Sequence, residues 1–420
     1  MDTLSLKAAI EKSIEWLVHS DIRNTDPQRE GFGGFNRAYD RRRRTYDLIY
    51  CEATGYALSL LVLLNRWFQK KDYLKMAADG AGFLLQHQND NGEQIRGAFH
   101  YGHYPVGGGR EAQFYSFDTA ICISGLLDLY GQNGEERYLK AALQAGHWLV
   151  SQAQKPDGSF RAMYNGRVGQ WDQERLKQTW YGDGGCLHAK NAIALFKLQA
   201  ATGVSAFGNA AEAVCRWVLR LQGKAGFFRA REEESYVFTH AHCYATEGIL
   251  YAYRATGSKE FLDATLKAGE WLLSRQERDG ALRVAYHVPL GRDVTWRPDE
   301  EGNIWLRAGK LLRGIISQEK RSDAVAQAIR IWMALYLLTA KTKFMQAADK
   351  ATAFLLSIQI QDGEDSHSVG GIPFACYNIG PYRRNSRLQT AWSVMFAIHA
   401  LQALRDLREG RRPSIASDIF

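Results

Sequence analysis

The sequence predicts an all-α fold in which six outer and six inner helices close into a ring. Three observations predict it. A motif with the consensus A-A-x-x-A-x-x-W-L-x-x-Q-x-x-D-G-x-F occurs in six copies along the 420 residues. A more apolar, helix-length segment follows each of the six copies, and the sixth such segment lies near the end of the chain. The helix at the N-terminus can therefore act as the outer partner of the last inner helix and close the ring.

The outer helices come from the motif itself. Each copy reads as an amphipathic helix that ends in a polar turn with glycine, as in "AALQAGHWLVSQAQKPDGSF". The aromatic anchors of the six copies lie 54 to 83 residues apart. They are Trp16, Phe83, Trp148, Trp217, Trp271 and Phe354. An open solenoid of helix pairs is the competing architecture, but its repeats are usually shorter and more regular.

The inner helices are expected between the copies. These segments are apolar on nearly all sides, which is typical of buried helices. They are 51–64, 118–131, 184–199, 240–253, 323–338 and 389–404. Their alternation with the outer copies spans nearly the whole chain, so we expect one domain, residues 1–420.

Composition and charge narrow the class of partner. The chain is 46% apolar and 23% charged, enough for a large core. Its net charge is +8, and the excess is concentrated at 41–44 and 382–387. Basic clusters serve nucleic acids, anionic lipids or anionic substrates. The chain has no zinc-finger, RNP or helix-turn-helix pattern, so we do not expect nucleic-acid binding.

Cysteine usage and the N-terminus predict the compartment. The six cysteines are widely spread and contain no CxxC, which favours free thiols in a reducing environment. The first residues form an amphipathic pattern without the basic start and apolar run of a signal peptide. No apolar stretch is long enough to cross a membrane. We therefore expect a cytoplasmic protein with no membrane insertion.

The repeats resemble two known groups of proteins. The W-L-x-x-Q-x-x-D-G-x-F turns are similar to the "QW" repeats of squalene-cyclase-like toroids. The alternation as a whole resembles the (α/α)6 toroid of carbohydrate-active enzymes, such as unsaturated glucuronyl hydrolases and sugar epimerases. The resemblance covers nearly the whole chain. It implies the architecture, whereas many unrelated reactions occupy this fold.

The functional site is expected at one mouth of the ring. Outer-to-inner connections are long, at 97–113, 158–180 and 282–320, and the reverse connections are short. All long loops therefore meet where the inner helices begin, and loops on a rigid scaffold commonly carry function. Ionisable residues recur at these helix starts. His240, Tyr244 and Glu247 also share one helical stripe, which predicts that they face the lumen.

These positions give the candidate site. The predicted catalytic residues are Asp118, Asp183, His240, His242 and Glu247. The predicted substrate-binding residues are Glu52, Trp180, Tyr181, His188, Tyr244, Trp296, Asp323, Arg383 and Arg384. Two structural alternatives stay open. An aspartate at a helix start often caps the helix, and Glu247 can instead be a buried partner of Arg330.

The leading functional hypothesis is a glycoside hydrolase. Such an enzyme needs one carboxylic acid to protonate the leaving oxygen and a second group to activate water. The resemblance to glucuronyl hydrolases implies a glycan that carries carboxylates, and the basic residues at the mouth suit it. We expect no metal and no cofactor, and the sequence leaves the oligomeric state open.

Four alternatives remain. A uronate lyase or sugar epimerase would use His240 or Glu247 as base, with an arginine to neutralise the enolate. A terpenoid cyclase would need a DxDD or DDxxD motif, and the chain contains neither. A zinc-dependent toroid would draw its ligands from Cys186, His188, His242 and Cys243, which lack tight ligand spacing. The last alternative is a non-catalytic glycan-binding protein.

Overall fold

The computed structural model describes residues 2–104, 109–172, 179, 181–232, 234–288, 319–379 and 382–416. The predicted substrate-binding residues Trp180 and Trp296 lie outside these ranges. All six cysteines are buried free thiols, as the sequence predicts. Within the described ranges, no helix has the length and apolarity needed to cross a bilayer. The cytoplasmic location stays a prediction.

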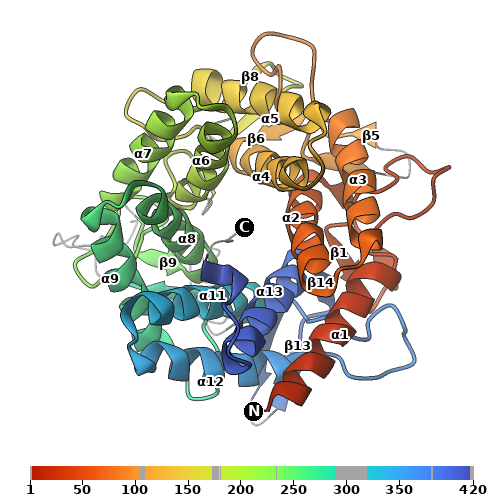
Figure 1. The fold of residues 1–420 in the computed structure, drawn as a ribbon, viewed down its shortest axis with the longest axis vertical. Coiled ribbons are helices and arrows are strands. Elements are labelled where there is room, and N and C mark those ends of the chain that lie inside the picture. The colour runs from red at the N-terminus through yellow and green to blue at the C-terminus, as the bar shows by residue number, and fades with distance from the viewer. Residues whose placement is uncertain are drawn as a thin grey trace, which may run out of the picture.

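The chain forms two concentric layers of helices around one axis, which confirms the predicted all-α toroid (Figure 1). The outer helices are α1 (Thr3–His19), α3 (Lys71–Gln86), α5 (Glu136–Trp148), α7 (Ser205–Leu219), α9 (Lys259–Arg275) and α12 (Thr342–Ile358). The inner helices are α2 (Cys51–Phe68), α4 (Ser116–Asn133), α6 (Asn191–Thr202), α8 (Thr239–Thr256), α11 (Ser322–Thr339) and α13 (Ala391–Arg408). Helix α1 packs against α13 and closes the ring, as expected.

One predicted helix start is wrong. The sequence predicts an inner helix from residue 184, but Gly184 has a left-handed φ of +64° and a 3-10 helix (Cys186–Lys190) precedes α6. A second irregularity follows α5, which continues as a π-helical turn (Leu149–Ala153). The other five inner helices each begin within two residues of their predicted start.

Inner and outer helices are joined by tight links. Each link from α2, α4, α6, α8 and α11 to the next outer helix has two residues. Its first residue adopts the left-handed conformation, which ends the inner helix and reverses the chain. These residues are Gln69, Gly134, Gly203, Gly257 and Ala340. The long connections therefore lie at the opposite face, where the inner helices begin.

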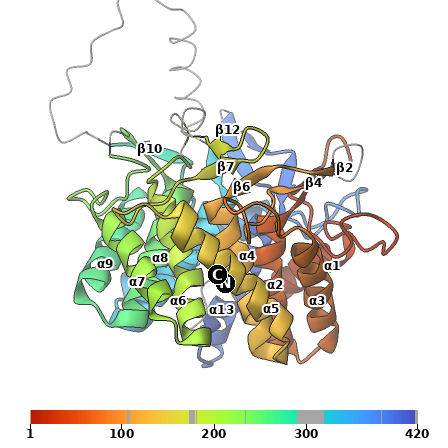
Figure 2. The same ribbon diagram turned by 90° about the horizontal axis from the view of Figure 1, so that it is seen from above.

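Short antiparallel strands lie on this face, which we call the mouth (Figure 2). Among the described residues, no sheet exceeds three strands. The sheets are β14-β1-β2 (Leu388–Thr390, Ala38–Asp40, Thr45–Tyr46), β3-β4-β5 (Ile49–Tyr50, Gly102–Tyr104, Gly109–Arg110), β6-β7-β8 (Gln113–Tyr115, Met163–Asn165, Gln170–Trp171), β10-β9 (Ala285–His287, Tyr236–Phe238) and β11-β12-β13 (Lys320–Arg321, Ala375–Ile379, Tyr382–Asn385). Strands β3, β6, β9, β11 and β14 run directly into inner helices, so they position the first helical turns.

A repeated glutamine contact joins neighbouring outer helices. Gln222 after α7 donates its amide to the carbonyl of Gly226 at 3.1 Å and to that of Ala264 on α9 at 2.8 Å. The same double contact is made by Gln88, Gln154, Gln276 and Gln359. Gln359 reaches Ala9 on α1 at 2.9 Å, so the last contact links the two ends of the chain. This contact explains the Gln of the repeat.

The glycine of the same turn is explained by its surroundings. Gly226 has a φ of +98°, and a Cβ there would lie 2.2 Å from the carbonyl oxygen of Lys267 on α9. No side chain fits between the turn and the next outer helix. The turn glycine and the glutamine amide thus hold the same junction together.

We expect Gly226→Ala to lower the free energy of unfolding by roughly 3 kcal/mol, because it adds a clash to the left-handed backbone. Gly257→Ala is the matched control. Its φ is also positive, at +71°, but nothing lies within 4 Å of the added Cβ. It should cost only about 1 kcal/mol. Chemical denaturation of both variants gives the comparison, and equal losses would show that the junction is not tightly packed.

Candidate active site

A cavity of about 320 Å³ opens at the mouth, between the starts of the inner helices. It is lined by Arg37, Tyr50, Glu52, Tyr101, Tyr115, Phe117, Asp118, Ala162, Tyr181, Leu187, His188, His240, Tyr244, Arg321 and Trp392. Most of these residues end a strand or lie in the first turn of an inner helix. The strand-to-helix junctions therefore build the cavity.

Glu52 on α2 and Asp118 on α4 form a pair of buried carboxyl groups. Their exposed fractions are 8% and 4%. Burial raises the pKa of Glu52 to about 7, although Tyr50 and the distant Lys190 act in the opposite direction. Burial and the neighbouring Glu52 raise the pKa of Asp118 well above its ordinary value. Both carboxyl groups are therefore easier to protonate than ordinary carboxyl groups, and the charge of Glu52 acts on Asp118.

Two arginines bring positive charge to the same cavity. Arg37 donates from Nε to Asp47 at 2.8 Å and from Nη1 to the Tyr101 hydroxyl at 3.1 Å. Arg321 forms a two-point contact with Asp323 and lies 4.0 Å from the centre of the Phe374 ring. Each guanidinium is thus fixed in place before any substrate binds.

Asp323 lies directly behind Arg321. Burial tends to raise the pKa of Asp323, but the Arg321 guanidinium and the Ala324 N–H outweigh it and hold the pKa below its ordinary value. The Trp392 indole also donates to Asp323, at 3.2 Å. Asp323 therefore orients two lining side chains, Arg321 and Trp392.

Two histidines face the cavity from other helices. Burial lowers the pKa of His188 and that of His240 to about 3, and the nearby Arg321 adds to the effect at His240. Both imidazoles are therefore neutral near pH 7, and each has one nitrogen that can accept a proton or a hydrogen bond.

Aromatic rings form a continuous wall along one side. Successive ring centres are 6.3 Å apart between Trp392 and Tyr50, and 4.7 Å apart between Tyr50 and Tyr101. The series continues to Tyr115 at 5.4 Å and Tyr181 at 6.3 Å. Such a wall offers flat apolar faces together with hydroxyl groups, which suits the mixed surface of a sugar ring.

Several predicted residues lie elsewhere. Asp183 accepts a hydrogen bond from the Ala162 N–H at 2.7 Å and lines a separate, open hollow beside Trp217. His242 packs between the layers, where its Nδ1 accepts from the Phe228 N–H at 3.0 Å and its ring centre is 4.7 Å from that of Trp271. Neither residue lines the cavity, because each points toward the outer helices.

Glu247 faces the lumen but lies below the cavity. Its carboxylate is fully buried, 2.6 Å from the Lys190 ammonium and in contact with Arg330. Gln327 donates to the same group at 3.3 Å. This arrangement favours the structural alternative, in which Glu247 is the partner of Arg330. The helical stripe indicated the correct face but not the depth.

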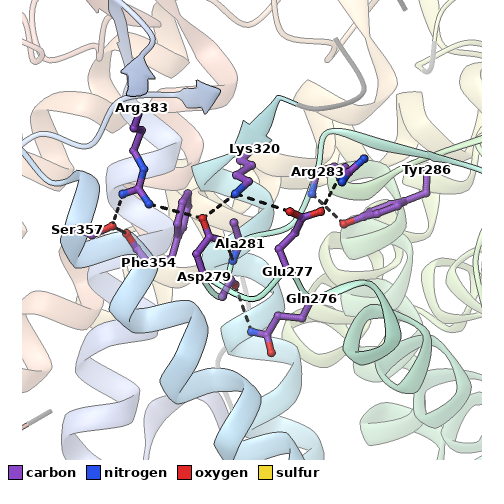
Figure 3. A network of polar contacts seen from close by, with 11 residues as sticks. Gln276, Glu277, Asp279, Ala281, Arg283, Tyr286, Lys320, Phe354, Ser357 and Arg383 are labelled. Carbon is purple, nitrogen blue, oxygen red and sulfur yellow. Dashed lines mark hydrogen bonds and ion pairs between the residues drawn. The ribbon is translucent and has the colours of Figure 1, made fainter. Parts of the chain in front are cut away.

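Arg383 and Arg384 lie on β13, outside the cavity. Arg383 donates to Ser357 at 2.7 Å and lies 3.6 Å from Asp279 (Figure 3). The same network pairs Lys320 with Asp279 at 2.6 Å and Arg283 with Glu277 at 2.6 Å. Arg383 therefore helps to tie β13 to the turn after α9. Arg384 is exposed.

The four residues considered for zinc do not converge. His188 lines the cavity, whereas His242 points to the outer layer. Cys186 and Cys243 direct their thiols to different backbone carbonyls, those of Ala241 and Ala324. Among the described residues, no three His, Cys, Asp or Glu side chains are grouped so as to hold a metal ion.

Sequence reasoning missed most of the wall and both cavity arginines. A signal exists for several of them. Tyr50, Tyr115 and Arg321 each lie directly before an inner helix, at the end of a short strand, so their shared position is the signal. Trp392 is the second residue of α13, so its place at a helix start was also a signal. Arg37 and Tyr101 have no such signal, because their position depends on strand pairing between distant segments.

Comparison with solved structures shows the fold. The chain is similar to cellobiose 2-epimerase from Bacillus thermoamylovorans B4167, with a TM-score of 0.72 and 13% identity over 96% of this chain and 99% of that one. It is also similar to an unsaturated glucuronyl hydrolase from Bacillus sp. GL1, responsible for the degradation of glycosaminoglycan (TM-score 0.64, 14% identity, 96% and 97% covered). A third similar structure is a D-mannose isomerase (TM-score 0.70, 12% identity, 96% and 97% covered). No family model and no curated protein matches the sequence.

We expect Glu247→Gln to lower the free energy of unfolding by about 3–5 kcal/mol, because it leaves Lys190 and Arg330 buried without their counter-ion. The double variant Glu247→Gln/Lys190→Met should recover part of this loss. Glu260→Gln is the control. Glu260 pairs with Arg216 on the surface, so its loss should cost below about 1 kcal/mol. Thermal or chemical unfolding measures all three, and an unchanged Glu247→Gln protein would refute the structural role.

Proposed function

We propose that this chain is an enzyme that acts on anionic carbohydrates by acid–base catalysis at Glu52 and Asp118. The observation that carries the proposal is the coupled, buried carboxyl pair in an aromatic cavity that also holds two fixed arginines. Perturbed titratable groups in a cavity are typical of catalytic sites. The similar structures include an epimerase, an isomerase and a hydrolase of carbohydrates, which is consistent with such a substrate.

Hydrolysis is the reaction that the carboxyl pair favours. Asp118, whose raised pKa keeps it protonated, gives its proton to the glycosidic oxygen as the bond to the leaving sugar breaks. Glu52, with a pKa of about 7, is partly ionised at neutral pH. Its carboxylate takes a proton from the water that attacks the anomeric carbon. Both groups are presented by neighbouring inner helices, whose adjacent starts face the same space.

The arginines favour a substrate with a carboxylate. Arg37 and Arg321 each hold one acidic partner and still line the cavity. A planar guanidinium matches a carboxylate in geometry and charge. Unsaturated glucuronyl hydrolase is described as degrading glycosaminoglycan, an anionic polysaccharide. We therefore propose a uronate-containing glycan.

Epimerisation is the second candidate, and the histidines favour it. His188 and His240 face the cavity as neutral imidazoles, and either can take a proton from a carbon beside a carbonyl group. A uronate lyase would use the same base and would leave a double bond in the product. In each of these reactions the positive arginines would stabilise the enolate.

One experiment separates the three reactions. The protein is incubated with unsaturated and saturated uronate disaccharides, cellobiose and mannose, in heavy-oxygen water and, separately, in deuterium oxide. Hydrolysis incorporates heavy oxygen into a cleaved product. Elimination gives an unsaturated product without added oxygen. Epimerisation leaves the mass unchanged in water but adds deuterium to the sugar. No reaction with any anionic sugar would refute the proposal.

We expect Glu52→Gln and Asp118→Asn each to lower kcat about 10²–10⁴-fold, because each removes a proton-transfer group. Asp183→Asn is the matched control, since it changes a carboxylate near the mouth that lies outside the cavity and keeps its acceptor oxygen. Steady-state kinetics on the substrate found above gives the result. Equal losses in all three variants would contradict the assignment.

We expect Glu52→Gln to stabilise the fold, and more at pH 8 than at pH 5. The pKa of Glu52 is raised from 4.5 to about 7 in the folded protein, so the native state binds a proton that the unfolded state has released. Wild-type stability therefore falls as pH rises from about 4.5 to about 7, and glutamine has no such titration. Denaturation curves at the two pH values measure the difference. A gain that is equal at both would refute the raised pKa.

A further inference from the structure

Two arginine clusters from opposite ends of the chain meet beside the cavity. Strand β1 pairs with β14, with Ala38 opposite Thr390 and Asp40 opposite Leu388 (Figure 1). The Arg41 N–H continues the pairing by donating to the Arg387 carbonyl at 2.9 Å. The run at 41–44 and the cluster at 383–387 are therefore neighbours at one edge of the mouth.

Five exposed guanidinium groups lie at this edge, and we call them the arginine rim. They belong to Arg42, Arg43, Arg44, Arg384 and Arg387. One carboxylate, that of Asp40, organises the rim. It accepts the N–H groups of Arg42 and Arg43 at 3.0 and 3.1 Å and pairs with Arg387 at 3.2 Å. Among the described residues, Arg387–Asp40 is the one ion pair that these five make, so the rim carries excess positive charge.

The rim is continuous with the cavity through the backbone. Arg37 lines the cavity and lies five residues before Arg42, the first rim residue, across β1. Trp392 lines it as well and lies five residues after Arg387, across β14. At ~3.3 Å per strand residue, the rim lies at most about 17 Å along the backbone from these two lining residues. An extended ligand that leaves the cavity on this side meets the rim after a short distance.

We infer that the arginine rim binds the anionic groups of a glycan chain that extends out of the cavity. The substrate is then a polyanionic oligosaccharide or polysaccharide, with its reacting end beside Arg37 and Arg321 and its distal carboxylates or sulfates on the rim. This inference rests on the proposed function. Exposed arginines each contribute little, but several on one edge raise the affinity for a multiply charged chain and make it sensitive to salt.

The test is a triple variant, Arg42→Gln/Arg43→Gln/Arg44→Gln, with a control of equal charge change. The control is Lys70→Gln/Lys71→Gln/Lys75→Gln, which alters exposed residues at the start of α3, on the face opposite the mouth. Both sets are made in the Glu52→Gln protein, so that binding is measured without turnover. Calorimetry follows uronate oligosaccharides from disaccharide to octasaccharide, at low and high salt.

We expect the rim variant to bind the octasaccharide about 10-fold more weakly than the parent, with a smaller salt dependence. Its affinity for the disaccharide, and that of the lysine control for both ligands, should stay unchanged. The inference is overturned if chain length does not raise affinity in the parent, if the control loses as much, or if a nucleic-acid duplex binds the rim more tightly than the octasaccharide.

The outcomes also separate this inference from the proposed function. Rim-dependent binding of long chains, without turnover of any anionic sugar by the wild-type protein, refutes the proposed enzyme and leaves the rim as a glycan-binding surface. Turnover that is independent of chain length and of the rim variant supports the enzyme and refutes the rim.

Discussion

The contact on which the ring depends is the glutamine amide that follows an outer helix. Five glutamines each satisfy two carbonyl groups, one in their own turn and one on the next outer helix, at a junction too tight for a side chain on the turn glycine. Backbone carbonyls buried at such a junction would be costly without a donor. In the first copy the glutamine is absent, and Arg23 forms an ion pair with the Asp79 carboxylate at 3.4 Å. Gly33 still packs against the carbonyl of Asp79, so the close approach is kept while an ion pair takes the place of the glutamine contact.

Because the ring depends on these glutamine junctions, the sequence predicts the fold well. Each junction is encoded within about twenty consecutive residues, so helix, turn and contact recur as one local pattern. Each two-residue link then forces the outer helix to run antiparallel to the inner helix before it. The inner start at 184 was wrong because two glycines, Gly184 and Gly185, interrupt an otherwise apolar segment that reads as helix.

The cavity is less predictable because some of its residues come from pairing between distant strands. Glu52, Asp118 and His240 lie in the first turn of an inner helix and Tyr244 lies one turn later in α8, so their side chains could be placed from helical periodicity. Arg37 reaches the cavity because β1 pairs with β14 from the other end of the chain, and strands of two or three residues carry almost no local signal. Asp183, at the predicted start near 184, turns outward because the helix does not begin there.

The inner helices carry two buried acidic sites. Glu247 is paired with cations, whereas Glu52 and Asp118 have raised pKa values, and the first site affects the second. Glu247 is neutralised by Lys190 and Arg330, so the deeper cluster holds two cations for one carboxylate. The excess positive charge acts on the mouth. The Lys190 charge lowers the pKa of Glu52 against the larger effect of burial, whereas Asp118 feels Glu52 as its main charged neighbour. This difference is the basis on which we propose Glu52 as the base and Asp118 as the acid. Lys190 therefore links the deeper ion cluster to the carboxyl pair at the mouth, as a smaller influence on the pKa of Glu52 than burial and the Tyr50 hydrogen bond.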